Sequence, residues 1–535
     1  MSISHVQLGG ELTGRSIFGG NRNRLEWIGM CTCIGVLFVA QLLLMQWAWT
    51  IAVTAVLMTA SVFMWTPRAT FNHCSLMGLI GIRLRYRWHR RQGLLDHAGG
   101  VVAEEPLPEA TTKKERKRIK ALPHAPAAMG QMRFFEIDLY PGQEDPGRVL
   151  IIRHRNHDQV TFNACFEFRT RQAGVVESSE GLRNHTGWSK FESALARSNS
   201  LVRYLQQVSR VVPFDPADHV HWLVGELPEN TPDLLVKSYA QLVDGIISDL
   251  EQNRTWLTVG IPATSSFYAA TERLPLDLSG QDLTREEIAE RRLEAVLAAQ
   301  LRTVVSRGKS NGMAFRPLNE QRFGAVCRSL QDPDDPLDRL EGADRYSMWM
   351  PWIGSEDRQY VRIKGRQRDW MTRTALVPRD GFAPGQLPVD LLVPLLTGVS
   401  PAVIRTVSTH MTLVPASTAR DEARQDVTVD RSNLQGKANQ VSDGTGETQV
   451  GISQQRLADL KPGSGIQGAE WAMAITIQAA SLDELESATN RIEEAAADCN
   501  ISVLSWQDSA QHLALPLTLP LATGMRRRKK GVLAA

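Results

Sequence analysis

One stretch near the start of the chain restricts the fold more than any other feature. Residues 27–67, between Glu26 and Arg68, contain no Asp, Glu, Lys, Arg or His. A bilayer core about 30 Å thick is crossed by about 20 helical residues, so this stretch is long enough for two spans with almost no loop. We place the spans at 27–45 and 47–65. A buried hairpin of a soluble protein is the weaker interpretation, because soluble helices normally carry a polar face.

Tryptophans and arginines around this stretch predict its depth and orientation. Trp27, Trp47, Trp49 and Trp65 fall near the four predicted helix ends, where indole rings favour the lipid headgroups. The connection at Gln46 carries no charge, whereas arginines flank the stretch on both sides. By the positive-inside rule we expect a multi-pass protein of the cell (inner) membrane with both termini in the cytoplasm. The flanking arginines are Arg15, Arg22 and Arg24 before the stretch, and Arg68, Arg83, Arg85, Arg87, Arg90 and Arg91 after it.

Two basic clusters have more than one interpretation. The arginines at 83–91 are expected to lie on anionic lipid, where each charge contributes about 1 kcal/mol. Together with residues 76–82 they would alternatively form a short interfacial helix, and nucleic acid is a third partner for the same charges. The same choice between lipid and nucleic acid applies to a basic tail. The tail consists of Arg526, Arg527, Arg528, Lys529 and Lys530.

The rest of the chain has an α+β pattern. Residues 148–154, 160–169, 255–261 and 471–478 are rich in β-branched and aromatic side chains and predict strands. Thr231 has the character of a helix N-cap and Ser481 opens a capping box, and a long helix is predicted at 284–305. A further helix is predicted at 189–206 and a strand at 210–214. The alternation of strand, helix and strand near the C-terminus suits a split βαβ or ferredoxin-like arrangement.

These patterns divide the chain into six parts. A cytoplasmic N-terminal tail is expected at 1–26, followed by the two-helix transmembrane hairpin at 27–66. A basic juxtamembrane segment and linker occupies 67–132. Two cytoplasmic α+β regions follow at 133–310 and 311–520, the second with a polar helical segment at 417–460. The basic tail takes up 521–535. The formal net charge of +2 rules out a uniformly basic nucleic-acid binder, although it is an average over segments of different charge.

Three glycine-rich motifs resemble ligand or catalytic sites but lack the structural context that each needs. Gly308-Lys309-Ser310 resembles the end of a P-loop, but Thr303 stands where that loop requires glycine, and a predicted helix precedes the motif. The same helix argues against the nucleophile elbow that the G-x-S-x-G pattern at 308–312 would form. Residues 463–468 fit G-x-G-x-x-G, but they precede a strand instead of following one, which predicts a linker.

Candidate metal ligands are equally isolated. His219 and His221 alternate on a predicted strand without a third ligand nearby in sequence. Asp332, Asp334 and Asp335 lie among prolines and lack the glycine and distal glutamate of a calcium loop, so we expect a turn. We therefore predict no catalytic, cofactor or metal site, and no enzyme. The six cysteines show no paired spacing and suit a reducing cytoplasm: Cys31, Cys33, Cys74, Cys165, Cys327 and Cys499.

In its order of features, the chain resembles a family of actinobacterial conjugation-locus membrane proteins. These join a short PrgI-like two-helix anchor to a region similar to the N-terminal, ATPase-free part of the type IV secretion traffic ATPase. The resemblance is carried by the anchor at 27–65 and the arginines at 83–91. It continues in Leu387-Pro388-Val389-Asp390-Leu391-Leu392-Val393-Pro394-Leu395-Leu396, Arg405-Thr406-Val407-Ser408, residues 419–424, residues 471–478 with the helix after them, and Leu515-Pro516-Leu517.

The resemblance implies a non-catalytic subunit of a conjugative type IV secretion (DNA transfer) apparatus. Its partners would be the membrane, the secretion or conjugation ATPase or coupling protein, and other subunits of an oligomeric complex. A type VII secretion membrane component is an alternative, since such proteins also place two spans before a cytoplasmic domain. A membrane-anchored enzyme with an unrecognised site is a second alternative, although no acids, bases or nucleophiles converge in the sequence.

Overall fold

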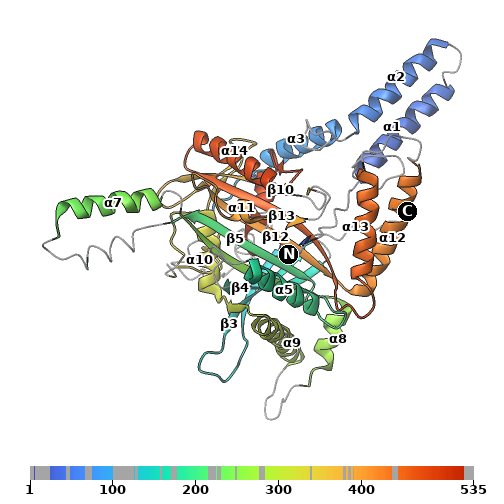
Figure 1. The fold of residues 1–535 in the computed structure, drawn as a ribbon. Coiled ribbons are helices and arrows are strands. Elements are labelled where there is room, and N and C mark those ends of the chain that lie inside the picture. The colour runs from blue at the N-terminus through green and yellow to red at the C-terminus, as the bar shows by residue number, and fades with distance from the viewer. Residues whose placement is uncertain are drawn as a thin grey trace, which may run out of the picture.

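The fold is α+β and is built on one large antiparallel sheet of 12 strands (Figure 1). The α+β class predicted from the sequence is thus confirmed. The computed structural model describes residues 5–6, 24–43, 48–66, 75–99, 126, 131–156, 159–169, 178–214, 225, 231–247, 250–275, 284–337, 340, 342–377, 381–382, 387–388, 391–436 and 444–522.

The strands occur in two groups along the chain, separated by helices. In chain order they are β1 (His5–Val6), β2 (Gln131–Asp138), β3 (Arg148–Asn156), β4 (Gln159–Arg169), β5 (Tyr204–Pro213), β6 (Glu251–Pro262), β7 (Ala314–Pro317), β8 (Trp352–Ile353), β9 (Val361–Lys364), β10 (Asp369–Val377), β11 (Leu387–Pro388), β12 (Ile404–Val414), β13 (Gly468–Ala479) and β14 (Ser505–Trp506). β1 and β11 form a separate two-stranded sheet.

The helices range from single turns to 26 residues in length. They are α1 (Arg24–Leu43), α2 (Ala48–Met64), α3 (Leu76–Arg91), α5 (Ser178–Leu195), α7 (Asp233–Ile247), α8 (Ser265–Arg273), α9 (Arg285–Ser310), α10 (Glu320–Gln331), α11 (Val393–Leu396), α12 (Ala416–Gly436), α13 (Thr445–Asp459), α14 (Leu482–Asp498), α15 (Gln511–Ala514) and the 3₁₀ helix η3 (Leu515–Thr518). Among the described residues, no helix combines the length and the apolar character required to cross a membrane.

The large sheet has the same topology in its two halves. Its order is β2-β3-β4-β6-β5-β12-β13-β10-β9-β8, with β7 paired to β4 and β14 paired to β10. Read inward from each edge, β2-β3-β4-β6-β5 therefore corresponds to β8-β9-β10-β13-β12. In both halves a helix, α9 or α14, connects the second central strand to the short added strand. The predicted regions 133–310 and 311–520 thus contribute to a single sheet.

An approximate two-fold axis relates these halves. β5 and β12 are antiparallel neighbours, and Val208 lies opposite Ser408 in their ladder. A two-fold rotation about an axis perpendicular to the sheet exchanges these two antiparallel strands. Such a rotation does not exchange the two faces of the sheet, so helices in corresponding positions lie on the same face. The connections between the central strands differ, because the first half inserts α7 there and the second half inserts the α12–α13 hairpin.

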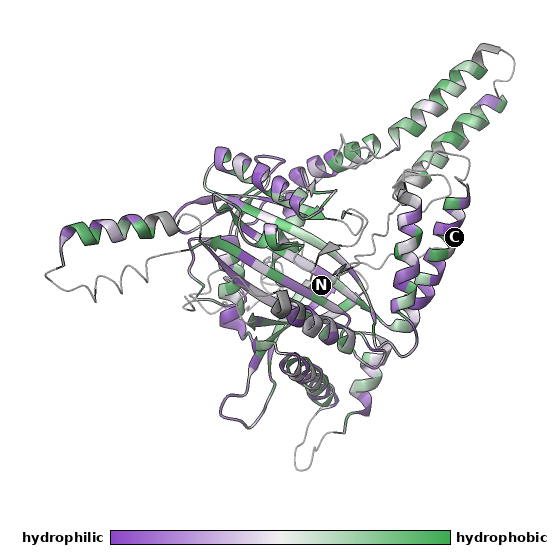
Figure 2. Cartoon of the chain, viewed as in Figure 1, coloured by the Kyte–Doolittle hydropathy of each residue, from purple (hydrophilic) through white to green (hydrophobic). Residues whose placement is uncertain are grey.

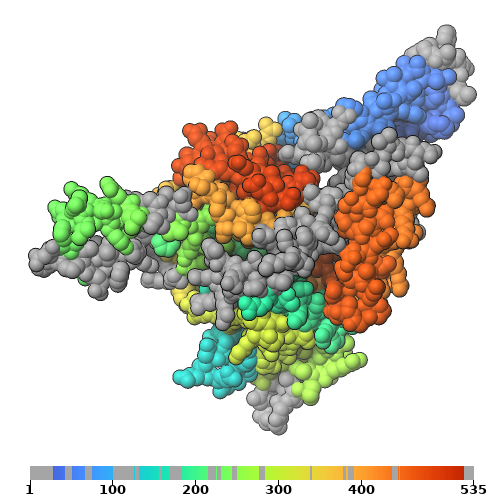
Figure 3. Space-filling view, in the orientation of Figure 1, coloured from blue at the N-terminus to red at the C-terminus, as the bar shows by residue number. Residues whose placement is uncertain are grey.

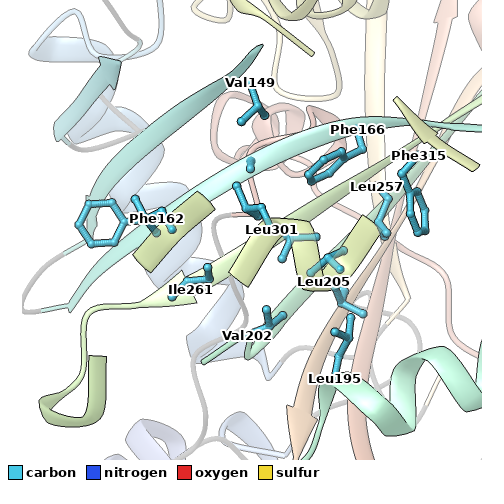
Figure 4. Close-up of a cluster of buried hydrophobic side chains, with 14 of the residues drawn as sticks. Val149, Phe162, Phe166, Leu195, Val202, Leu205, Leu257, Ile261, Leu301 and Phe315 are labelled. Carbon is cyan, nitrogen blue, oxygen red and sulfur yellow. The ribbon is translucent and has the colours of Figure 1, made fainter. Parts of the chain in front are cut away.

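One face of the sheet is covered by helices in both halves. Phe162 and Phe166 of β4 alternate with Cys165, so they point to the face that packs against α5 and α9. Figure 4 shows Leu301 of α9 and Phe315 of β7 beside Leu257 in this cluster. In the second half, α11 and α14 pack on the same face in the same way. These two cores hold most of the buried aliphatic and aromatic side chains of the sheet.

The opposite face is more polar and is covered by α10 and by residues 511–522, which we call the C-terminal strap. Gln206 of β5 donates hydrogen bonds to the carbonyls of Leu517 and Leu519, at 3.0 and 2.8 Å. The amide of Ala522 donates to the side-chain oxygen of Gln206 at 2.6 Å. Because each buried polar atom of this amide has a partner, a polar residue is tolerated in the centre of the sheet.

Part of the sequence prediction between residues 189 and 214 was wrong. The predicted helix at 189–206 is α5, which ends at Leu195, and Tyr204 already begins β5. The strand predicted at 210–214 is only the end of β5. Gln206, Gln207 and Ser209 interrupt the apolar alternation that would have revealed a strand. Their positions are accounted for by distant partners, which the local pattern does not contain.

Candidate membrane interface

Helices α1 and α2 form a paired hairpin, close to the boundaries predicted for the two spans. The hydroxyl of Thr54 donates a hydrogen bond to the side-chain oxygen of Gln41 at 2.6 Å, which joins the two helices. At the end of the hairpin nearer to the large sheet and its covering helices, which we call the body, the ring of Trp65 lies against Gly29. A methyl group added to Gly29 would stand 2.3 Å from a ring carbon of Trp65. A small residue therefore lets the chain after α2 pack closely on α1.

The outer surface of this hairpin is apolar (Figure 2). Figure 3 shows the two helices projecting from the rest of the molecule, and Figure 1 shows that they project away from the sheet. Their exposed side chains are large and hydrophobic, in contrast to those of a soluble helix, which are mostly polar. On α1 they are Ile28, Val36, Phe38, Val39 and Leu42, and on α2 they are Ile51, Val53, Val56, Leu57, Val62, Phe63 and Met64.

The structure describes only some of the tryptophans predicted to mark the helix ends. Trp65 lies just after α2 and packs against Gly29, as described above. Trp27 belongs to α1 and Trp49 to α2, but their side chains lie outside the described residues, and Trp47 lies outside them altogether. The interfacial role assigned to the four indoles stays a prediction.

Helix α3 contains the arginine cluster. The sequence alternative of a helix formed by residues 76–82 and these arginines is confirmed as secondary structure, since α3 extends from Leu76 to Arg91. Ser75 caps it by accepting a hydrogen bond from the amide of Gly78 at 3.0 Å. His89, Arg90 and Arg91 occupy the last turn, where positive charge is favoured by the helix dipole.

One face of α3 docks on the second half of the sheet. The hydroxyl of Tyr86 donates to the carbonyls of Gly354 and Asp357, both at 3.1 Å. Nδ1 of His89 lies 3.0 Å from Nε2 of His512 in the strap. Both histidines and Tyr86 are buried. The helix after the hairpin is therefore fixed to the body by contacts that involve both the sheet edge and the strap.

The residues after α3 strengthen this attachment. His97 forms a bridge with Trp352 of β8, and the indole nitrogen of Trp352 donates to the carbonyl of Leu95 at 3.2 Å. The carboxylate of Asp96 accepts hydrogen bonds from the amides of Gly354 and Ser355 at 3.0 and 2.9 Å. Residues 95–97 thus pair with the edge strand β8 and leave it covered.

The opposite face of α3 is exposed and amphipathic. Ile80, Leu84 and Trp88 follow each other at intervals of four residues and are 39%, 57% and 55% exposed. At 100° per residue they form one row, directly opposite Tyr86 and His89. A second row beside it carries arginines. All five arginines of the cluster are exposed: Arg83, Arg87 and Arg91 in that second row, and Arg85 and Arg90 elsewhere on the helix.

The glycine of the P-loop-like motif has a packing role. Gly308 lies in the last turn of α9, and a methyl group added there would stand 2.0 Å from a ring carbon of Phe315. Glycine is required because β7 returns closely past the end of the helix. The helix that argued against a phosphate loop begins close to the predicted start at residue 284, where the structure shows a capping box between Thr284 and Glu287. The segment at 463–468 leads directly into β13, as a linker should.

The aspartates at 332–335 form a turn stabilised by arginines, as predicted. Asp332 accepts hydrogen bonds from the amides of Asp334 and Arg366 at 3.1 and 2.8 Å. The carboxylate of Asp334 pairs with Arg368 at 2.9 Å. Asp335, almost wholly buried, lies 3.0 Å from the guanidinium of Arg328. Each of the three carboxylates thus contacts amide or guanidinium groups of the protein.

Other predicted sites cannot be placed. His219 and His221 lie outside the described residues, as do Arg526, Arg527, Arg528, Lys529 and Lys530. Within the part of the chain that is described, no three His, Cys, Asp or Glu side chains are grouped as metal ligands would be. No protein-family model matches this sequence, and no curated protein matches it.

Proposed function

We propose that this chain is a non-catalytic, membrane-anchored subunit of a conjugative type IV secretion apparatus, and that it holds the traffic ATPase or coupling protein at the membrane. The observation that carries the membrane part is that α1, α2 and α3 each expose large hydrophobic side chains. The secretion part rests on the sequence resemblance and on where its characteristic stretches lie in the fold.

The anchor follows from the chemistry of the N-terminal helices. Residues 27–67 contain no ionisable side chain, and apolar groups cover the outside of the α1–α2 pair. At 1.5 Å per residue, the 20 residues of α1 rise about 30 Å and the 17 of α2 about 26 Å. Within the described residues neither helix alone has both the length and the apolar character of a span. We therefore propose that the two spans use the whole uncharged stretch at 27–67, which includes the residues between the two helices.

Helix α3 would then lie at the membrane surface. Its apolar row would enter the headgroup region, and the adjacent guanidinium groups would contact lipid phosphates. Its other face is already occupied by the body, through Tyr86 and His89. This arrangement would place both termini in the cytoplasm and the second half of the sheet directly beneath the bilayer.

The docking role is supported by the position of the stretches that carry the resemblance. Residues 387–396 form β11 and α11, Arg405-Thr406-Val407-Ser408 lies in β12, and residues 471–478 lie in β13. Leu515-Pro516-Leu517 belongs to η3 in the strap. β12 and β13 are neighbours in the second half of the large sheet, and the carbonyl of Leu517 in η3 lies within hydrogen-bond distance of His410 of β12 and Gln206 of β5. β11 instead pairs with β1 in the separate two-stranded sheet. We propose β12, β13 and η3 as the region that a partner would recognise.

Lipid contact of α3 can be tested with the full-length protein in bilayers that contain brominated lipids, which quench nearby tryptophans. We expect Trp88→Phe to remove a quenched component of the fluorescence. The control Trp349→Phe should remove an unquenched one, because Trp349 is buried in the body. Equal quenching of the wild type and both variants would reject the surface position of α3.

Topology and partners need separate experiments. Reporter fusions after Arg24 and after Arg91 should both report a cytoplasmic position, and an extracytoplasmic result at either would reject the hairpin. Crosslinking in membranes followed by mass spectrometry should recover a secretion ATPase or coupling protein. Recovery of type VII components instead, or of no secretion protein, would contradict the proposed role. Saturable hydrolysis of ATP or esters by the purified chain would contradict its non-catalytic nature.

A further inference from the structure

A cleft of about 340 Å³ opens on the strap face of the first half of the sheet, far in sequence from the membrane helices. Its walls carry three arginines, Arg254 of β6, Arg316 of β7 and Arg322 of α10, together with Glu167 of β4. The floor includes Trp256 and Leu318, both buried. The cleft thus combines a charged rim with an apolar floor.

Regular structure holds these charged groups in position. Glu167 lies opposite Trp256 in the β4–β6 ladder and opposite Arg316 in the β4–β7 ladder. Arg322 is placed by the cap of α10, because the side chain of Asn319 accepts a hydrogen bond from its amide at 3.0 Å. Each guanidinium therefore approaches the cleft from a different rigid element, so the arrangement does not depend on a loop.

The positive charge in this region exceeds the negative charge. Three guanidinium groups face one carboxylate in the cleft, a difference of two charges. Arg210 lies directly opposite Arg254 in the β5–β6 ladder and is only 5% exposed. Arg210 itself donates a hydrogen bond to the hydroxyl of Thr406 at 2.9 Å and has Asp332 as a nearby carboxylate. An anion in the cleft would be attracted by the excess guanidinium charge there, and the buried floor would strengthen that attraction by lowering the local dielectric constant.

The geometry favours a phosphate group over a single carboxylate. Each guanidinium presents a planar pair of donors that matches two oxygens, and three such groups require more acceptors than a carboxylate offers. A phosphomonoester has three terminal oxygens and a charge of about −1.5 to −2 at neutral pH, which matches the excess in the cleft. The volume leaves room for an organic group on the apolar floor, and it lies within the usual range for small-molecule sites.

We propose that this cleft binds a small phosphomonoester whose phosphate contacts Arg254, Arg316 and Arg322, and whose organic group packs over Trp256 and Leu318. The site is distinct from the P-loop-like motif, which lies at the end of α9 and is explained by packing against Phe315. It requires no hydrolysis and is independent of the secretion role, since none of its residues belongs to the membrane helices or to the stretches that carry the resemblance.

Isothermal titration of the full-length protein with adenosine 5′-monophosphate tests the proposal. Inorganic phosphate and adenosine serve as comparison ligands. We expect saturable one-to-one binding of the monophosphate, at least tenfold tighter than that of either comparison ligand, and weakened by added salt. Arg316→Gln should reduce the affinity at least tenfold without changing the melting temperature, because Arg316 is exposed.

Arg153→Gln is the matched control, since Arg153 is an exposed arginine on β3 outside the cleft. It should leave binding unchanged. Absence of binding, or equal loss in the two variants, would overturn the site. Equal affinity for inorganic phosphate and the monophosphate would overturn the role of the apolar floor, and with it the assignment of an ester.

Discussion

Glu251 and Arg405 form a doubly hydrogen-bonded ion pair between the two halves of the sheet. The terminal nitrogens of Arg405 lie 2.5 and 2.8 Å from the two carboxylate oxygens of Glu251. Its Nε donates to the carbonyl of Leu395 at 2.6 Å. The side chain of Arg405 is fully buried and that of Glu251 is 8% exposed. This pair connects the start of β6 to β12 and α11, where the halves meet.

Removal of one partner of this pair should be costly. Arg405→Met leaves the Glu251 carboxylate buried without its cation, so we expect a loss of about 3–5 kcal/mol in the free energy of unfolding, measured by urea titration. The control Arg424→Met breaks the exposed pair with Asp421 and should cost no more than about 0.5 kcal/mol. The double variant Glu251→Gln with Arg405→Met should be less destabilised than the sum of the single variants; additive losses would contradict direct coupling.

The strap should depend on one amide in β5. Gln206→Leu leaves the carbonyls of Leu517 and Leu519 and the amide of Ala522 without this partner. We expect a loss of about 2–4 kcal/mol, since each unsatisfied buried group costs about 1–3 kcal/mol. Hydrogen exchange in the strap should accelerate in parallel. Gln207→Leu, on the other face of the same strand, should leave the strap protected, and similar exchange in both variants would contradict the role of Gln206.

Substitutions in the Gly308-Lys309-Ser310 motif should separate packing from phosphate binding. Gly308→Ala places a methyl group against Phe315 and should destabilise the fold by about 1–3 kcal/mol, as overpacking does. Lys309→Ala removes an exposed side chain and should change stability by less than about 0.5 kcal/mol. Melting temperatures with and without nucleotide provide the measurement. A stabilisation by nucleotide that Lys309→Ala abolishes would restore the P-loop interpretation.

The attachment of α3 should weaken in acid. Burial lowers the pKa of His89, with Arg85 adding to the effect. Burial also lowers the pKa of His512 to about 4, and His89 and Arg85 contribute in the same direction. An unfolded histidine titrates near pH 6.5, so below that value the detached state binds protons that the docked state does not. Stability is therefore complete above about pH 6.5 and falls as the pH is lowered towards 4.

Hydrogen exchange of the α3 amides, corrected for the intrinsic rate, measures this effect. At pH 5 we expect more frequent opening of α3 than at pH 7.5, while the amides of α9 stay protected. His512→Gln removes the titrating group in the strap and should reduce the difference between the two pH values. An unchanged difference in that variant would show that other groups control the attachment.

Elements with strong local signals could be predicted from the sequence. The long helix predicted at 284–305 corresponds to α9, and the β-branched residues around 148–169 identified β3 and β4. The first part of β5 was missed because Gln206 is buried by partners more than 300 residues away. The docked face of α3 was missed for a similar reason, since nothing local marks Tyr86 and His89 as buried. The three arginines of the cleft come from three different elements, and no sequence motif joins them.

The repeated topology has a consequence for how surfaces are distributed. If the two halves were separate identical chains, any surface on one would appear on the other. Because the two halves are joined in one polypeptide, they share a strand topology but can expose different side chains. The second half receives α3 at its edge, whereas the first carries the arginine cleft. The two halves of one symmetric framework thus carry different surfaces. A substitution in either surface requires no corresponding substitution on the other side of the β5–β12 junction.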